Sequence, residues 1–325
     1  MKSKAVRLKE PGQLVLTEKD LQPGLGEVVV KTFQTSICDA DLRAYKGLYM
    51  PEDLPSFEWI GHEGGGEVVE VGEGVREFKP GDFVMCFGPN NAWSEYFKAH
   101  VNTLLPAIDG MSKEYCCLGE PLAVGMFGVF QSGIQLGDEA AVFGLNFQGL
   151  LAVEGLKKRG AKRVICIDYS KKHMDIAREL GADVVLNTDQ VDVVQAIREL
   201  TSDRGVDVAL HSCGYWNPNA EAYFNKCIQV VRDEGIMISL PDMMSAINVS
   251  LHRIHHHAME IRFPAIMHHN PEFLRQWVPR VLRPVRDGFI DPSKLITAEF
   301  PLHEVEKAIL VFEEDLEQVK IVLKP

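Results

Sequence analysis

The sequence lacks long hydrophobic runs, and it has no excess of positive charge. Its most apolar stretch, Leu118 to Phe130, is interrupted by glycines and falls short of the roughly 20 residues that cross a bilayer. A membrane-spanning protein is therefore excluded. The 34 basic and 46 acidic residues give a formal charge of -12, which repels phosphate backbones and anionic lipids. We accordingly expect a small-molecule substrate as partner, with no nucleic acid and no membrane surface.

The cysteines show no recognisable disulfide or zinc-binding pattern. Seven of them are scattered singly along the chain except for one adjacent pair, and no CxxC motif occurs. An odd, scattered set suits a reducing compartment, and the missing CxxC excludes the commonest structural zinc sites. The first residues mix Lys2, Lys4 and Arg7 with other residue types and show neither the apolar core nor the cleavage site of a signal peptide, so we expect cytoplasmic residence.

The 325 residues are enough for two domains, and they show two different patterns of predicted secondary structure. The first third has short strands between Pro, Gly and acidic turns and few helices; they are expected at 14–16, 27–33, 66–71 and 82–87. From about Leu136 strands and helices alternate. The strands are expected at 140–143, 163–167, 184–186, 206–210 and 235–240, and the helices at 147–159, 171–180, 191–200 and 219–231. This alternation predicts an α/β fold with a parallel, doubly wound sheet covered by helices on both faces. Near the C-terminus we expect helices at 271–283 and 302–312 and a closing strand at 319–323.

A glycine motif lies between the first of those strands and its helix. Gly144-Leu145-Asn146-Phe147-Gln148-Gly149 has the position of the Rossmann dinucleotide fingerprint, and Asp168 ends the next strand. Asn146 replaces the middle glycine, and Asn is the other residue that best tolerates left-handed dihedrals. Asp168 favours NAD over NADP, because a carboxylate repels a 2′-phosphate, whereas Lys171 and Lys172 weaken that preference. The alternative is a tight turn that binds nothing. The predicted cofactor-binding residues are Gly144, Asn146, Phe147, Gln148, Gly149, Asp168, Lys172 and Cys213.

Four residues of the β-rich part are zinc-ligand types: Cys38, the adjacent pair His62-Glu63, and Glu120. One thiolate, one imidazole and carboxylates suit a catalytic zinc, which keeps an exchangeable position, better than a closed structural site. Taken singly, however, a cysteine is usually a small buried hydrophobe and a His-Glu pair is usually at the surface. Their flanking motifs are what favour the metal site.

Those motifs resemble the zinc-containing branch of the medium-chain dehydrogenase/reductase family. They are Ile37-Cys38-Asp39-Ala40-Asp41, the segment from Gly61-His62-Glu63 through Gly72, Phe78-Lys79-Pro80-Gly81-Asp82, and Gly119-Glu120-Pro121-Leu122. The last is similar to the sorbitol and threonine dehydrogenases, and the resemblance extends to the closing Lys320-Ile321-Val322-Leu323. It implies a β-rich, GroES-like catalytic domain at 1–124 and 265–325, a Rossmann domain at 125–264, a site in the cleft between them, and a homo-oligomer, dimer or tetramer.

The same resemblance assigns the site. Cys38, His62 and Glu63 would bind Zn²⁺, and Glu120 would be either a fourth ligand or hydrogen-bonded to the zinc water. Asp41 would orient the ring of His62. The metal would act as a Lewis acid while a hydride passes to or from NAD.

Two features depart from the family pattern. Members usually carry Ser or Thr two residues after the cysteine, as a proton relay, and often His three residues further on, whereas this chain has Ala40 and Arg43. Another group, a water chain, Glu63 or Glu120 would carry the proton, or the chemistry needs no relay. Arg43 would pair with a substrate anion or the cofactor pyrophosphate. The four-cysteine structural zinc lobe is missing, because Cys86 to Asn91 leads straight to Ala92.

The remaining candidate residues give weaker evidence of function. His252 and His255 to His257 form a cluster for which we expect a solvated or interface role near the last Rossmann strand. His211 stands where the family commonly has an acid near the cofactor. Five residues could line a substrate pocket or belong to the core: Tyr45, Leu48, Tyr49, Phe57 and Trp59.

The expected function is hydride transfer between NAD(H) and a small polar alcohol or polyol, or its carbonyl, on a zinc site. One alternative is a zinc reductase or a redox-neutral enzyme that uses bound NAD and needs no conventional proton relay. The other is a protein that binds NAD(H) without catalysis, against which the intact set of four ligand types argues.

Overall fold

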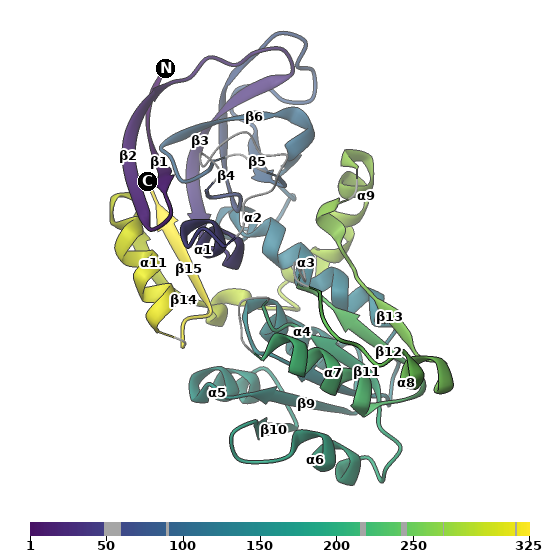
Figure 1. Ribbon diagram of the computed structural model, residues 1–325. Helices are drawn as coiled ribbons and strands as arrows, with labels where there is room; N and C mark the ends of the chain where they lie inside the picture. Colours follow the sequence, from purple (N-terminus) through teal and green to yellow (C-terminus); the bar gives the residue numbers. More distant parts are fainter. Residues whose placement is uncertain (49–59, 89–90, 215–218, 242–245, 269, 316) are drawn as a thin grey trace. The chain divides into compact units, whose positions relative to one another are not determined.

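The computed structural model describes residues 1–48, 60–88, 91–214, 219–241, 246–268, 270–315 and 317–325 (Figure 1). They form two compact units. The first unit comprises Met1–Pro121 and Met267–Pro325, and the second comprises Leu122–Ile266. Within the described ranges, no helix combines the length and the apolarity needed to span a bilayer.

The first unit is built on a seven-stranded sheet in the order β14-β15-β3-β4-β5-β7, with β6 paired to β3. The strands are β3 (Glu27–Ser36), β4 (Gly64–Val71), β5 (Phe83–Cys86), β6 (Tyr96–His100), β7 (Leu104–Pro106), β14 (Ile296–Pro301) and β15 (Lys320–Lys324). A separate antiparallel pair joins β1 (Lys2–Glu10) and β2 (Gln13–Asp20). Val28, Val30, Val68 and Phe97 form part of the apolar core of this sheet.

The strand-rich prediction for this region is confirmed, but β2, β3 and β4 are longer than predicted and β5 is shorter. Strand β2 continues to Asp20, because pairing with β1 stabilises it along its whole length. The charged residues of this half-exposed segment obscure the alternation of apolar and polar residues that predicts a strand. The unit also contains helices that the pattern did not indicate. The helix predicted at 271–283 is α9, which ends at Val281, and the short helix α10 follows from Arg283. Pro284 has no amide hydrogen with which to continue the ladder of α9. The helices are α1 (Asp39–Tyr45), α2 (Lys113–Cys117), α9 (Pro271–Val281), α10 (Arg283–Arg286) and α11 (Val305–Glu314).

The second unit confirms the doubly wound prediction. Its six parallel strands have the order β10-β9-β8-β11-β12-β13. Successive strands are added first on one side of β8 and then on the other, as in a Rossmann sheet. They are β8 (Glu139–Phe143), β9 (Arg163–Asp168), β10 (Val184–Asn187), β11 (Val206–His211), β12 (Val231–Ser239) and β13 (Glu260–Arg262). The helices are α4 (Phe147–Lys158), α5 (Lys171–Glu179), α6 (Val193–Leu200), α7 (Ala220–Val230) and α8 (Leu251–His256); α3 (Gly119–Gln131) crosses the boundary between the units.

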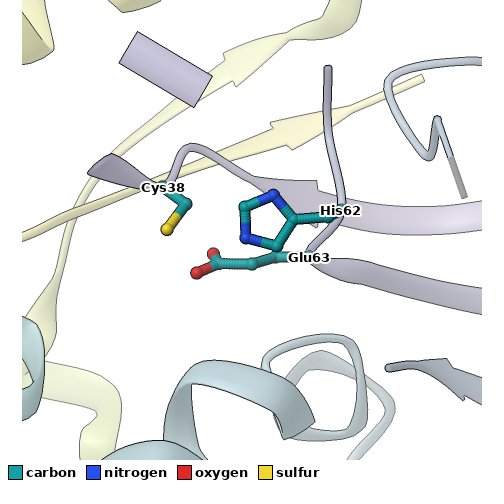
Figure 2. Close-up of side chains that lie close together, drawn as sticks. All are labelled: Cys38, His62 and Glu63. Carbon is teal, nitrogen blue, oxygen red and sulfur yellow. The ribbon is translucent and has the colours of Figure 1, made fainter. Parts of the chain in front are cut away.

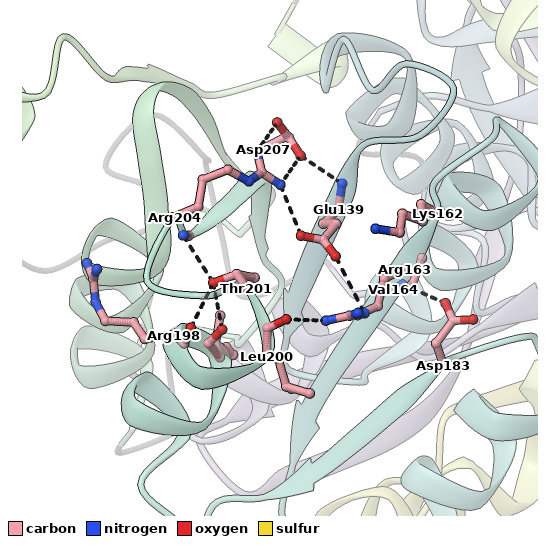
Figure 3. A network of polar contacts seen from close by, with 12 residues as sticks. Glu139, Lys162, Arg163, Val164, Asp183, Arg198, Leu200, Thr201, Arg204 and Asp207 are labelled. Atoms are coloured by element: carbon pink, nitrogen blue, oxygen red, sulfur yellow. Dashed lines mark hydrogen bonds and ion pairs between the residues drawn. The ribbon is translucent and has the colours of Figure 1, made fainter.

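The amino ends of the central strands are tied by a polar network (Figure 3). Arg204 donates to Glu139 at 3.0 Å and to both oxygens of Asp207 at 2.9 and 3.0 Å, while Asp207 also accepts the backbone N–H of Glu139 at 2.8 Å. Arg163 adds a contact to Glu139 at 3.5 Å. The predicted cofactor residues lie at the opposite, carboxyl ends of the strands, where Gly144 follows β8 and Asp168 ends β9.

Candidate functional site

Three potential metal ligands converge in the first unit. Cys38, His62 and Glu63 are the only group of three or more His, Cys, Asp or Glu residues in the described ranges whose donor atoms all lie within 4.8 Å of one another. Figure 2 shows the sulfur, the imidazole and the carboxylate turned toward one point. Cys38 lies at the start of α1, and the other two directly precede β4, so two separate loops bring the donors together.

Asp41 holds these loops in place. Its Oδ2 accepts the N–H of Cys38 at 2.9 Å, and its Oδ1 accepts the N–H of Gly61 at 2.8 Å. The same Oδ1 lies 3.4 Å from Nδ1 of His62. The carboxylate therefore joins both ligand loops and contacts the ring that it was expected to orient. Burial acts to lower the pKa of His62, but the charge and hydrogen bond of Asp41, together with the neighbouring Cys38, raise it well above its ordinary value.

Sequence reasoning missed Lys320 as a site residue. Its ammonium group is buried and lies 2.8 and 3.0 Å from the two oxygens of Glu63, and it also donates to the carbonyl of Ile37 at 3.2 Å. Ser36 Oγ donates to the same carboxylate. Burial alone would lower the pKa of Lys320, but the Glu63 carboxylate raises it overall. A buried lysine that opens an apolar strand was the only available sequence signal.

Glu120 lies near this group but outside it. Burial, together with the charge of Glu63, raises the pKa of Glu120 to about 7. The same two causes raise the pKa of the Cys38 thiol to about 11 in the protein chain by itself. A divalent cation would reverse the effect on the thiol, because a coordinating thiol is deprotonated.

The donor set fits zinc. Ligand atoms that share one tetrahedral Zn²⁺ lie about 3 to 4 Å apart, given bonds of roughly 2.0 to 2.3 Å, and the spacing of the three donors is compatible with this. The mixture of sulfur, nitrogen and oxygen is typical of catalytic zinc. Cys38, His62 and Glu63 would hold the ion, with Glu120 as a further carboxylate in its electrostatic neighbourhood.

The second site is the glycine loop of the second unit. Gly144 has φ +88°, and a Cβ there would stand 2.8 Å from the backbone nitrogen of Cys213. A Cβ on Gly149 would stand 2.1 Å from the carbonyl oxygen of Gly144. Both positions therefore need glycine for close packing of strand, loop and helix, as the fingerprint requires. The loop fits a dinucleotide pyrophosphate at the N-terminus of α4.

The expectation for Asn146 was wrong in one respect. Its dihedrals are φ -69° and ψ -174°, so it does not use the left-handed region. It is instead the N-cap of α4, and its Oδ1 accepts the N–H of Gly149 at 3.0 Å. An asparagine is as good an N-cap as serine or aspartate, and this explains the residue without any unusual backbone conformation.

Asp168 ties the end of β9 to the glycine loop. Its Oδ2 accepts the N–H of Leu145 at 2.7 Å, and its Oδ1 accepts the N–H groups of Tyr169 and Ser170 at 2.7 and 2.8 Å. The carboxylate is thereby fixed at the place where a ribose would lie in a Rossmann fold.

The other predicted cofactor residues differ in how they are exposed. Phe147 and Cys213 are buried, and the backbone of Cys213 packs against Gly144. Gln148 and Lys172 are half-buried. His211 is fully buried at the end of β11, with Nδ1 3.2 Å from Ser239 Oγ, and burial lowers its pKa to about 4. A neutral imidazole thus stands at this position.

The remaining candidates are spread out. Arg43 lies on α1 one turn after Asp39, whose pKa is raised to about 6 by burial against the opposing charges of Lys320 and Arg43. Tyr45 is buried and Leu48 is exposed. The predicted pocket residues Tyr49, Phe57 and Trp59 lie outside the described residues.

The histidine cluster does not converge on one point. His252, His255 and His256 belong to α8, and the rings of His252 and His256 lie 4.1 Å apart between centroids. His257 follows the helix and pairs with Asp233 at 2.5 Å.

Comparisons with known proteins show which family the chain resembles. An alcohol dehydrogenase GroES-like domain matches residues 24–129, and a zinc-binding dehydrogenase domain matches residues 149–273. The chain is 30% identical to (R,R)-butanediol dehydrogenase of Bacillus subtilis, with 92% of this chain and 93% of the relative covered. It is 26% identical to sorbitol dehydrogenase of the same organism, over 87% of this chain and 85% of the relative. The crystal structure of 2R,3R-butanediol dehydrogenase from Bacillus subtilis superposes with a TM-score of 0.84 at 27% identity, covering 99% of each chain.

The matches extend over both units, and the two matched domains contain the metal ligands and part of the dinucleotide loop, respectively. The chain therefore belongs to the zinc-binding alcohol dehydrogenase family, with a GroES-like domain followed by a zinc-binding dehydrogenase domain.

Proposed function

We propose that this protein transfers a hydride between NAD(H) and a small polar alcohol or polyol, or the corresponding carbonyl compound, at a zinc ion. The observation that carries the proposal is the convergence of Cys38, His62 and Glu63 within 4.8 Å. The names of the relatives support the substrate class, because butanediol, sorbitol and threonine all carry a hydroxyl next to another polar group.

Each residue of the metal site has a distinct task. When bound, the zinc ion would supply Lewis acidity to the reacting oxygen of the substrate. Cys38 and His62 provide the soft and borderline donors, and Asp41 fixes both loops and the imidazole. Lys320 balances the charge of Glu63, which would otherwise be buried without a partner.

Proton transfer needs a group other than residue 40. Ala40 has no side-chain group that accepts a proton, and Glu63 already accepts hydrogen bonds from Lys320 on both oxygens and would in addition bind the ion. We assign one of two roles to Glu120: it would be either the fourth zinc ligand or the acceptor of the substrate proton. Arg43, on the same helix as Asp41, would bind an anionic part of the substrate or the cofactor pyrophosphate.

The cofactor choice rests on Asp168. Proteins of the same fold have been crystallised with NADH in one case and NADP in another, so the fold alone does not select the cofactor. An ionised carboxylate has about four lone-pair sites, and three backbone amides occupy three of them at Asp168. The remaining site suits a ribose hydroxyl, and the negative charge disfavours a 2′-phosphate.

A second function is favoured by Ala40. An enzyme that reduces a conjugated double bond or an imine, or that returns its hydride within one catalytic cycle, depends less on a hydroxyl relay at this position. Such an enzyme would keep the metal and the dinucleotide site and would release no NADH from a polyol.

The deciding experiment measures zinc and NADH on the same preparation. Freshly purified protein is analysed for zinc by mass spectrometry and then incubated with NAD or NADP and a panel of butanediol, sorbitol, threonine and a simple monoalcohol. We expect stoichiometric zinc and net formation of NADH with at least one polar alcohol. Conversion without net NADH would favour the redox-neutral alternative, and folded protein without zinc or turnover would favour a binding protein without catalysis.

We also propose that the protein is a homo-oligomer, by its resemblance to the family. Light scattering coupled to size-exclusion chromatography tests this, and a mass of one chain would contradict it.

A further inference from the structure

The side chain of Asn146 is held by two donors. Its Oδ1 accepts the N–H of Gly149 at 3.0 Å and the hydroxyl of Ser212 at 2.6 Å. These residues belong to the glycine loop, to the first turn of α4 and to the segment after β11, so three parts of the second unit meet at one oxygen atom.

Two donors on the oxygen fix the orientation of the amide. Because Oδ1 faces Gly149 and Ser212, the NH₂ group must lie on the other side of the planar amide and cannot exchange places with the oxygen without breaking both bonds. Asn146 is half-buried, in contrast to its buried neighbours Leu145 and Phe147. The first amides of α4 have no acceptor within the helix, and only that of Gly149 is satisfied by the Asn146 side chain in the contacts described above.

Ser212 is itself rigidly placed. Its backbone N–H donates to the carbonyl of Phe143 at 2.8 Å, and its Cβ lies 3.2 Å from the position that a Cβ on Gly149 would take. The hydroxyl therefore reaches Asn146 from a backbone that cannot move away from the loop.

We propose that Asn146 binds the cofactor pyrophosphate through its side-chain NH₂ group, and that Ser212 is the positioning residue that holds this group toward the phosphates. The inference rests on the proposed use of NAD(H). In the fingerprint, the middle glycine lets the pyrophosphate approach the backbone; here a side-chain donor replaces that approach. The opposite possibility is that Asn146 merely obstructs the phosphates.

The sharpest test is Asn146→Asp. The aspartate keeps the shape, the cap on Gly149 and the acceptor for Ser212, but it places a negative oxygen where the NH₂ group was. Aspartate and asparagine are equivalent N-caps, so the thermal unfolding temperature should be unchanged or higher. The dissociation constant of NADH, measured by fluorescence titration, should rise by at least about 10- to 100-fold, the worth of a hydrogen bond to a charged group.

Two further variants separate binding from obstruction. Asn146→Gly restores the family residue and should weaken NADH binding, whereas it would strengthen binding if the asparagine only obstructed. Ser212→Ala keeps Asn146 but removes one of the two hydrogen bonds that orient its amide. We expect this variant to lose less affinity for NADH than Asn146→Asp loses.

The choice of ligand checks the role of the phosphates. ADP-ribose carries the pyrophosphate without the nicotinamide, and it should lose affinity in all three variants in parallel with NADH. Adenosine, which has no phosphate, should bind each variant as it binds the wild type; a merely structural role would weaken both ligands alike and would overturn the proposal.

The outcomes distinguish this inference from the proposed function. Wild-type protein that binds neither NADH nor ADP-ribose would refute the proposed cofactor and the inference with it. Wild-type protein that binds both, together with an Asn146→Asp variant of equal affinity, would refute the inference and leave the proposed function intact.

Discussion

The metal site of the first unit and the dinucleotide loop of the second are stabilised by different interactions. The metal site joins side chains that are far apart in the sequence, and its central contact is a buried ion pair between Glu63 and Lys320, 257 residues apart. The dinucleotide loop uses consecutive residues, backbone amides and glycines without Cβ atoms. The first site should therefore be sensitive to loss of a charge or a donor, and the second to added atoms.

Loss of a metal donor should have the largest effect. Cys38→Ser replaces the thiolate with a poor zinc ligand, so we expect loss of zinc and a fall in turnover of about 10³-fold or more, since the ion supplies several kcal/mol of charge stabilisation. Zinc analysis and assays of NADH formation check this. Cys116→Ala, at another buried cysteine of the same unit, is the matched control and should retain its zinc.

The same variant tests the contrast between the sites. NADH should bind Cys38→Ser with its wild-type affinity, because every donor of the dinucleotide loop identified above belongs to the second unit. A parallel loss of zinc and NADH binding would show that the two sites are not independent.

Loss of the buried cation comes next. Lys320→Met leaves the carboxylate of Glu63 without its partner in the core, which should lower the free energy of unfolding by about 3 to 5 kcal/mol. Lys324→Met removes an ion pair with Glu299 from the same strand, but these two side chains are 44% and 54% exposed. That control should change stability by less than about 1 kcal/mol.

Urea denaturation of both variants measures the difference. Lys320→Arg keeps the charge and should recover part of the lost stability. If Lys320→Met were as stable as Lys324→Met, the ion pair would not be the interaction that maintains the metal site.

The same contrast explains what could be predicted from the sequence. The sheet of the second unit was largely predictable, because each strand and helix carries its own periodicity; the helix predicted at 147–159 is α4, Phe147–Lys158. Cys38, His62 and Glu63 were found through flanking motifs. Lys320 was not, because its role depends on a partner that no local pattern reveals. The left-handed conformation that the glycine pattern suggested for Asn146 was wrong, because the residue is an N-cap bonded to Gly149; its second contact, to Ser212, comes from a distant segment that no local pattern reveals.

An added methyl group tests the dinucleotide loop. Gly144 and Gly137 both have positive φ, +88° and +94°, but only the former is crowded, with Cys213 N 2.8 Å from a new Cβ. Gly144→Ala should destabilise the protein by about 2 to 5 kcal/mol, the sum of about 1 to 2 for the dihedral and about 1 to 3 for overpacking. Gly137→Ala should show only the first part, measured by the same denaturation.

NADH binding separates these two variants further. We expect Gly144→Ala to bind NADH at least about tenfold more weakly, because a displaced loop misplaces its donors, and Gly137→Ala to bind it normally. Equal affinities would show that close packing of the glycine loop is not required for the cofactor.

Acid should act on the second unit through His211, with the smallest effect. Burial lowers its pKa to about 4 from 6.5, so the unfolded chain binds the proton more readily. The contribution of the neutral ring to the free energy of unfolding is fully present above pH 6.5 and is lost as the pH falls toward 4. The loss is about 2 kcal/mol at pH 5. Asp207, whose pKa is lowered to about 2 by Arg204 and its other hydrogen-bond donors against burial, contributes only to losses below pH 3.8 and stays silent in this window. Between pH 7 and 5, His211→Asn should therefore lose about 2 kcal/mol less of its free energy of unfolding than the wild type loses. An unaltered slope in His211→Asn would place the acid sensitivity of the protein elsewhere.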